Sequence, residues 1–237
     1  TNTRANLDRI RDVLRLVEAY HQQVRTTIEF FAFDAADVNT ANPTNINEAA
    51  GALRKHGRGT LLAAPCLITP GGQEATTKGG VECIYPTSFR AICGGTNTND
   101  VTSANVPAVL PGDFETREVG AILSATPEFV EERTIMVILR AEFVEAPEWR
   151  DYGMTCTNAA GEVTHMAMQQ PFFPEYSLET SVTVQHGQTV LVGGGVPMRD
   201  GKRLVYAFLT VHFVDPTGKP LPDRAKDPPA ANDKESE

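Results

Sequence analysis

An enzyme of this size would use histidine, acidic and serine side chains for catalysis, or a glycine-rich loop to bind phosphate. The spacing of these residues is therefore informative. No Asp or Glu pair stands at a convincing distance from a histidine, and the histidines fall on separate expected elements. Ser177 and Ser181 lack the context of a nucleophile elbow. The run Gly193-Gly194-Gly195 is followed by neither the Lys-Ser/Thr pair nor the helix that a phosphate-binding P-loop requires. The sequence therefore predicts a protein that is not an enzyme and needs no cofactor. The histidines are His21, His56, His165, His186 and His212.

The four cysteines, Cys66, Cys83, Cys93 and Cys156, have no spacing that suits a zinc site, so no metal is expected. The segment between Cys83 and Cys93 contains a proline and could fold back as a hairpin. Such a hairpin would allow a cross-strand disulfide in an oxidising compartment. The alternative is four separate buried thiols, and the sequence leaves both open.

Composition narrows the class of protein. Charged residues make up 22% of the chain and hydrophobic residues 41%, which is typical of a soluble globular protein. The net charge of −9 argues against nucleic acid or an anionic membrane surface as a partner. No run of apolar residues is long enough for a transmembrane helix. The chain starts at Thr1 without a signal peptide, which we interpret as processing or truncation rather than as evidence for the cytoplasm.

The segment 178–214 carries the strongest structural pattern. Val182 and Val184 alternate with polar residues, as in a strand with one solvated face. Asp200-Gly201 is a strong hairpin signal. The return strand, 204–214, is apolar on both faces, so it must be buried in a core, in a subunit interface or in lipid.

The remaining pattern predicts an α+β fold that is mainly β, with a short N-terminal helix and one further helix. Apolar residues at helical spacing predict the first helix over 7–20, and an Asn45 cap predicts the second over 46–56. Strands are expected at 24–33, 60–69, 74–85, 89–93, 118–125 and 134–145.

Three segments lack any period. Residues 94–113 are rich in Gly, Asn, Thr and Pro, and a loop of this length is uncommon unless it is functional or disordered. Residues 147–174 predict a second irregular insert. Residues 216–237 are Pro-rich and charged, which predicts a disordered tail.

Three blocks, in order along the chain, resemble the motifs of the bacterial secretins, the outer-membrane ring channels of type II and type III secretion and of type IV pili. The blocks are LAAPCLIT with GQEA (62–69 and 72–75), REVGAILSATP (117–127) and GQTVLVGG (187–194). The matching positions, which we expect to be structural, are Pro65, Gly72, Ala75, Val119, Gly120, Pro127, Gly187, Gly193 and Gly194.

The resemblance implies a secretin-type β domain of long antiparallel strands over 23–215, with residues 1–22 as the remnant of a preceding periplasmic module. It implies a homo-oligomeric ring in the outer membrane and periplasm of a Gram-negative-type bacterium, passing secreted protein or a pilus. It also places a gate or lip loop at 94–113; the alternative there is a surface loop without a gating role. The candidate gate residues are Gly94, Gly95, Pro107, Pro111 and Gly112.

Long strands with two apolar faces and open sheet edges favour assembly, because a closed ring of identical subunits removes the edges. The chain also departs from the family pattern. Gly195 stands where secretins have a large apolar residue, and no clean pair of lipid-facing alternating strands is evident. These departures keep a second hypothesis open, a secretin-like periplasmic scaffold or binding domain that forms no pore.

Overall fold

The computed structural model describes residues 22–40, 46–92, 108–131, 133–157 and 161–222, with a few residues near the N-terminus. By its internal contacts the chain forms two compact units. Unit 1 comprises Thr1–Thr77, Leu123–Ala141 and Leu178–Glu237, and unit 2 comprises Lys78–Ile122 and Glu142–Ser177. Most of the expected N-terminal helix, 7–20, lies outside the described residues.

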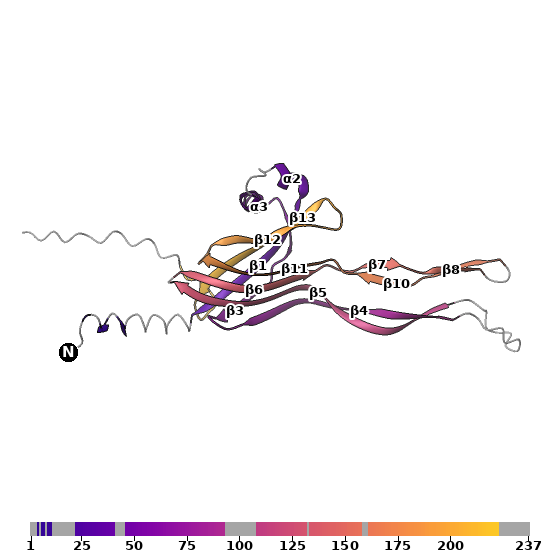
Figure 1. Cartoon of the computed structure of the whole chain (residues 1–237), viewed down its shortest axis with the longest axis horizontal. Helices are drawn as coiled ribbons and strands as arrows, with labels where there is room; N and C mark the ends of the chain where they lie inside the picture. The colour runs from indigo at the N-terminus through magenta and orange to yellow at the C-terminus, as the bar shows by residue number, and fades with distance from the viewer. Residues whose placement is uncertain are drawn as a thin grey trace, which may run out of the picture. The chain divides into compact units, whose positions relative to one another are not determined.

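The described chain is mainly β with two short helices, α2 (Ala35–Thr40) and α3 (Ile46–Lys55), so the expected fold class is confirmed (Figure 1). Helix α3 was expected; α2 was not. The strands are β1 (Gln23–Asp34), β2 (Thr60–Ala63), β3 (Cys66–Pro70), β4 (Ala75–Ile92), β5 (Ala108–Glu131), β6 (Thr134–Val144), β7 (Glu148–Asp151), β8 (Met154–Thr157), β9 (Val163–Met166), β10 (Gln169–Phe172), β11 (Glu175–Gln185), β12 (Thr189–Pro197) and β13 (Arg203–Val214).

The strands form two larger sheets and two small ladders within the described residues. The first sheet has the order β12-β13-β1-β2, with β3 also paired to β1. The second sheet has the order β11-β6-β5-β4. The ladders are β10-β7 and β8-β9. The register of β1 against β13 is antiparallel and unbroken from Gln23↔Val214 to Asp34↔Arg203.

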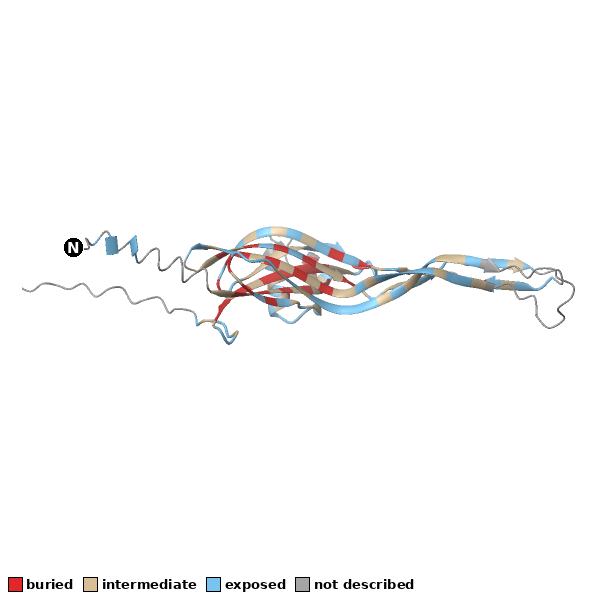
Figure 2. Ribbon diagram, turned by 90° about the horizontal axis from the view of Figure 1, so that it is seen from below, coloured by how far each residue is buried: buried red, intermediate tan, exposed pale blue. Residues whose placement is uncertain are grey.

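Strand β13 lies in the middle layer of unit 1, which explains why it is apolar on both faces. Leu209, Val211 and Phe213 are at most 4% exposed on the face that packs toward the second sheet. The Phe213 ring there stacks on Phe129 of β5, with centroids 5.6 Å apart. Of the three environments that the sequence left open for this strand, the structure selects the core of the chain (Figure 2).

The opposite face of β13 packs under the two helices. Tyr206 and Phe208 form one buried cluster with Phe33 of β1, Val38 of α2 and Leu53 of α3. The rings meet edge to face, with the Phe33 centroid 5.8 Å from Tyr206 and 6.2 Å from Phe208. Arrangements of this kind contribute beyond the apolar area that they bury.

The expected hairpin turn between β12 and β13 is confirmed. The Met198 N–H donates to the Arg203 carbonyl (2.7 Å), and Gly201 has a φ of 64°. The Asp200 carboxylate accepts a hydrogen bond from the Arg203 side chain and the backbone N–H groups of Lys202 and Arg203. These bonds, the Arg203 one foremost, lower the pKa of Asp200 to about 2.

The hairpin that the sequence left open between Cys83 and Cys93 does not form over the described residues, because β4 runs without a turn from Ala75 to Ile92. Pro86 is tolerated because β4 is an outer strand of its sheet, where a proline need not interrupt the ladder. At a strand rise of about 3.3 Å per residue, Cys83 and Ile92 lie roughly 30 Å apart, far beyond the reach of a disulfide. Cys83 is a half-buried free thiol, and Cys93 lies outside the described residues.

Parts of the three segments that were expected to be irregular form strands or make defined contacts. Residues 108–113 belong to β5, so Pro111 and Gly112 are strand residues and not loop residues; 94–107 lie outside the described part. The segment 147–174, expected to be an irregular insert, contains β7 to β10. Each of these strands is too short for its sequence to show an alternating pattern. Residues 215–222 contact β13, so the tail expectation is wrong there, while 223–237 are not described.

Replacing Phe33 with alanine should lower the free energy of unfolding by about 3–5 kcal/mol, because the ring is only 1% exposed and joins both helices to the sheet. Chemical denaturation followed by circular dichroism measures the change. The matched control is Leu61→Ala on β2, where the side chain is 50% exposed and the expected change is within about 0.5 kcal/mol. Equal losses in the two variants would contradict this assignment of the core.

Candidate functional site: the motif glycines and the β4–β5 crossing

The first two motif blocks meet in unit 1. Pro65 splits the expected strand 60–69 into β2 and β3, because a proline has no N–H for the ladder; its carbonyl instead accepts from the Ile28 N–H (3.1 Å). Gly72 turns the chain into β4 with a φ of 74°, and its N–H donates to the Pro127 carbonyl of β5 (2.7 Å). Ala75 is the first residue of β4. The hydrogen bond between Gly72 and Pro127 therefore ties the start of β4 to β5.

The third block builds a turn and an irregular strand. Gly187 has a φ of 75°, and its N–H donates to the Val211 carbonyl (2.8 Å). Strand β12 shifts register against β13 on both sides of Gly193-Gly194. Gly194 has a φ of 151°, and an added Cβ would lie closer than 3.0 Å to Tyr206. Only glycine fits this approach of β12 to the Tyr206 ring.

In unit 2 the Val119-Gly120 motif lies where the backbones of β4 and β5 approach closely. Gly120 has a φ of 137°, and a Cβ there would come within 3.0 Å of the Gly79 carbonyl oxygen and the Gly80 Cα. A Cβ at Gly80 would in turn meet the Val119 carbonyl oxygen. The two backbones thus touch at a point where neither strand carries a side chain. We call Gly79, Gly80 and Gly120 the glycine crossing.

An ion pair spans the glycine crossing. Lys78 Nζ lies 2.9 and 3.0 Å from the two carboxylate oxygens of Glu118. A cavity of about 160 Å³ lies beside the crossing, lined by residues of β4, β5 and Val144. It is smaller than the pockets that hold small-molecule ligands. Both charged side chains are substantially exposed, so the ion pair adds little to the free energy of folding. Its main effect is to orient β4 and β5 relative to each other.

Further along unit 2, cross-strand contacts tie three strands together. Arg117 of β5 pairs with Glu175 of β11 and lies 3.9 Å from Glu142 of β6. Its guanidinium also sits 5.7 Å from the centre of the Phe173 ring. Tyr85 of β4 donates a hydrogen bond to Glu115 of β5 (3.2 Å). Partial burial, followed by this bond, raises the pKa of Tyr85.

The two small ladders of unit 2 join at Asp151. Its Oδ1 accepts from the N–H groups of Gly153 (2.8 Å) and Met168 (2.9 Å), and its Oδ2 lies 2.6 Å from His165 Nε2. The His165 bond, followed by the two backbone bonds, lowers the pKa of Asp151 to about 2. Residues paired at the joint come from both arms of the insert, so Asp151 fixes the direction in which β8 and β9 leave β7 and β10.

Among the motif residues, Gly72 and Pro127 meet through one backbone hydrogen bond, and Val119 and Gly120 lie against Gly79 and Gly80. The residues of the third block lie on β12 and on the turn before it. The sequence missed Gly79-Gly80, Arg117, and the Asp151–His165 pair. A Gly-Gly dipeptide inside a strand pattern was the one readable signal, because it marks close backbone approach. No group of metal-ligating side chains is present in the part of the chain that the structure describes.

The sequence profile of the Secretin family, described as bacterial type II and III secretion system protein, matches residues 52–203. The chain belongs to the secretin family. No curated protein sequence matches it. No helix among the described residues is long and apolar enough to cross a membrane.

Solved secretin structures are similar to the chain at low identity. The type II secretion system secretin GspD of E. coli K12 is 14% identical, with 89% of this chain and 54% of that chain covered and a TM-score of 0.43. The Vibrio cholerae type IV competence pilus secretin PilQ is 14% identical over 89% and 65%, with a TM-score of 0.38. The Salmonella type III injectisome secretin InvG is 12% identical over 96% and 73%, with a TM-score of 0.36. The chain spans about half the length of the first secretin chains that it matches, 54% and 52%.

Gly120→Ala should push β4 and β5 apart, because the added Cβ meets the Gly79 carbonyl and the φ of 137° is unfavourable for alanine. We expect faster amide exchange in both strands around the glycine crossing and a lower thermal midpoint. Gly79→Ala is the matched control, since a Cβ there has nothing within 4 Å and no unusual φ. If both variants behave alike, the close approach at Gly120 is not what constrains the strands.

The hydrogen bonds that Asp151 accepts should weaken at low pH. Because its pKa is lowered to about 2 from an ordinary 3.8, the ionised carboxylate supports the joint above about pH 4, and this support is lost as the pH falls toward 2. NMR shifts of the Gly153 and Met168 amides follow the transition. Asp151→Asn keeps an acceptor oxygen but cannot ionise, so its amides should stay flat over that range. A transition of the same size in that variant would refute the assignment.

Proposed function

We propose that this chain is the ring-forming subunit of an outer-membrane secretin channel that passes secreted protein or a pilus. The observation that carries the proposal is the four-stranded sheet β11-β6-β5-β4, whose outer strands β11 and β4 both lack a neighbour among the described residues. Strand β4 is 18 residues long and β11 is 11 residues long. Two long open edges on one sheet favour head-to-tail association of identical copies.

The backbone groups of β11 that would make this contact can be named. The His186 N–H donates to the Arg133 carbonyl, and the Pro174 carbonyl accepts from the Glu145 N–H, so even-numbered residues of β11 direct their backbone groups toward β6. Burial alternates without interruption along the strand, which excludes a bulge that would change this parity. The N–H and C=O groups of Glu179, Ser181 and Thr183 therefore point toward the open edge.

Pairing of β11 in one copy with β4 of the next would satisfy these groups and repeat around a ring. A closed ring leaves no edge, which is the condition that a bilayer imposes on strands. Within this proposal the ring is a homo-oligomer of the outer membrane and periplasm, its partners are itself and the passing cargo, and no reaction is catalysed. Family membership supports each of these points.

The segment that links β4 to β5 in the sequence is the proposed gate or lip, with Pro111 and Gly112 at the base of its return strand. Deleting residues 94–107 should raise the conductance of reconstituted rings, because the aperture would lose the segment that narrows it. Planar-bilayer recordings measure this. Unchanged conductance in rings of normal size would leave the segment as a surface loop.

One observation favours the alternative of a secretin-like periplasmic scaffold that forms no pore. Along β4, Lys78 and Glu82 are exposed on the same face as Ile84, so charged and apolar residues are mixed there. A strand facing lipid carries a continuous apolar face instead. In this alternative the same edges bind a partner in the periplasm.

The deciding experiment is negative-stain imaging and mass photometry of the protein with and without detergent. The proposal predicts closed rings that need detergent. Thr183→Pro should abolish them, because proline removes an outward N–H and crowds the edge without cutting a bond to β6. Thr183→Val, which keeps the N–H, should assemble as the unmodified chain does.

A monomer that stays soluble without detergent would favour the scaffold. Rings that survive Thr183→Pro unchanged would show that the β11 edge is not the contact, even if the chain forms a channel.

A further inference from the structure

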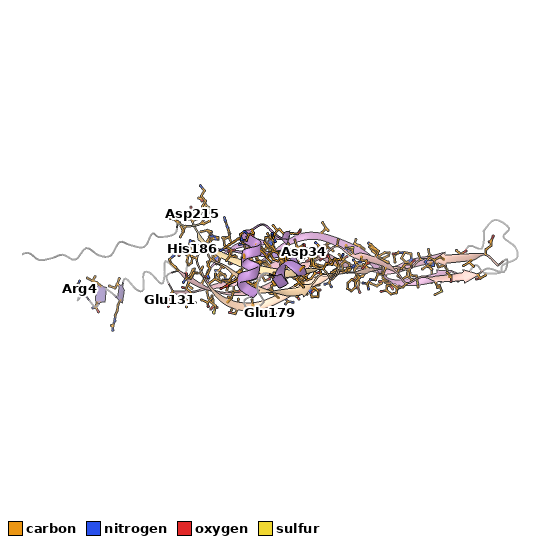
Figure 3. The ribbon with its side chains drawn as sticks, turned by 90° about the horizontal axis from the view of Figure 1, so that it is seen from above. Arg4, Asp34, Glu131, Glu179, His186 and Asp215 are labelled. Atoms are coloured by element: carbon orange, nitrogen blue, oxygen red, sulfur yellow. The ribbon has the colours of Figure 1, made fainter. Side chains whose placement is uncertain are left out.

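A groove in unit 1 lies between helix α3 and the outer strand β12, and it plays no part in the proposed contact between β11 and β4. Its volume is about 370 Å³, which is within the range of pockets that hold ligands. All of the residues that line it belong to unit 1. Figure 3, seen from the side on which the helices lie, shows the helices across the strands of unit 1, beside Asp34 at the end of β1.

The groove is apolar on its sheet side and lined by small residues on its helix side. Leu191 of β12 and Phe208 of β13 are cross-strand partners that line the sheet side. Gly51 and Ala52 line the middle of the α3 side. A Cβ added at Gly51 would have nothing within 4 Å, so no neighbour in the fold requires a glycine there. A glycine inside a helix is less favourable than an alanine, and here its effect is to leave space in the groove.

The edge of β12 beside the groove pairs with no strand among the described residues, since β13 is its only neighbour there. The direction of its backbone groups follows from β1. The Ile28 N–H donates to the Pro65 carbonyl, on the side of β1 away from β13. In an antiparallel ladder, such a residue forms a pair without hydrogen bonds with its partner on the other side, here Leu209. Leu209 therefore directs its N–H and C=O toward β12, where its partner is Val190.

The backbone groups of Thr189 and Leu191, on either side of Val190, then point toward the unpaired edge. The hydroxyls of Thr189 and Thr210 lie 2.7 Å apart, which fits the close side chains of a pair without backbone hydrogen bonds. The side chains of Thr189 and Leu191 both line the groove. Beyond Leu191 the register of β12 shifts. A short unpaired edge and an apolar groove thus lie side by side.

Cationic side chains gather at one end of the groove. Arg54, Lys55 and His56 line it at the C-terminal end of α3, whereas Glu48 lines it in the first turn of the helix. Arg54 is paired with Glu29. Lys55 is exposed and forms no ion pair with any residue that the structure describes. An acidic group that entered this end of the groove would therefore meet an uncompensated positive charge.

We propose that the groove binds an extended peptide segment of another protein, one that carries an apolar side chain followed by acidic residues. The segment adds a strand to the edge of β12, packs its apolar side chain against Leu191 and directs its acidic residues toward Lys55. In strand addition, main-chain hydrogen bonds give affinity and pockets for alternate side chains give specificity. The outward backbone groups of Thr189 and Leu191 supply the former, and the groove beside them supplies the latter.

The test is fluorescence anisotropy of the intact chain with a labelled probe, a peptide of alternating valine and threonine that ends in two aspartates. The same peptide ending in two lysines should bind more weakly. Gly51→Leu should weaken binding of the aspartate peptide about tenfold or more, because the new side chain takes the space of the apolar group. The thermal midpoint of this variant should not fall, since leucine is a better helix former than glycine.

A charge reversal tests the cationic end without filling the groove. Lys55→Glu should weaken binding of the aspartate peptide about threefold, because an attractive exposed charge becomes a repulsive one. Arg58→Glu is the matched control. Arg58 is also exposed but does not line the groove, so its reversal should have a smaller effect at physiological salt.

Three results would overturn the proposal: no binding of the aspartate peptide, equal binding of the two peptides, or unchanged binding in Gly51→Leu. If Gly51→Leu stops the chain from associating with itself but leaves peptide binding as it was, the groove holds a second copy and the proposal is wrong. Thr183→Pro alters only the β11 edge and should leave peptide binding unchanged. The peptide site and the ring can therefore fail separately.

Discussion

The pairing of β1 with β13 is the constraint on which unit 1 depends. The two strands share an unbroken antiparallel register of twelve residue pairs, and both faces of the pair are covered, one by the second sheet and the other by α2 and α3. Along most of β1, buried side chains alternate with half-buried ones, so a one-residue slip would exchange the residues facing the two layers. The turns at Gly72, Gly187 and Asp200 lead the chain into β4, β12 and β13.

Unit 2 is organised by different forces. Few of its side chains are buried, and its strands are located by backbone contact at the glycine crossing and by polar contacts such as Arg117–Glu175 and Asp151–His165. Contacts of this kind set direction and spacing but contribute little free energy at an exposed surface. The chain thus joins a unit stabilised by apolar burial to one shaped mainly by geometry.

Sequence patterns predicted the parts of the fold that depend on burial. The two-faced apolar strand β13, the alternation in β11 and the Asp200-Gly201 turn all have local signals. The patterns failed where long-range pairing decides the structure. Nothing local shows that β4 continues through Pro86, that β5 begins at Ala108, or that Asp151 meets His165 fourteen residues later. The motif glycines were found as a family pattern, but their role as close approaches became visible only with the partner strand beside them.

The edge of β11 that pairs with no strand among the described residues has a consequence for the chain before it meets any partner. Backbone groups pair without reading sequence, so an outward row of them will accept almost any extended peptide, including an unrelated one. The exposed side chains that accompany the row, Glu179, Ser181 and Thr183, are polar and keep this edge soluble without blocking it. Assembly of newly synthesised copies therefore competes with aggregation. Slow assembly, or a high local concentration of unassembled chains, would favour aggregation.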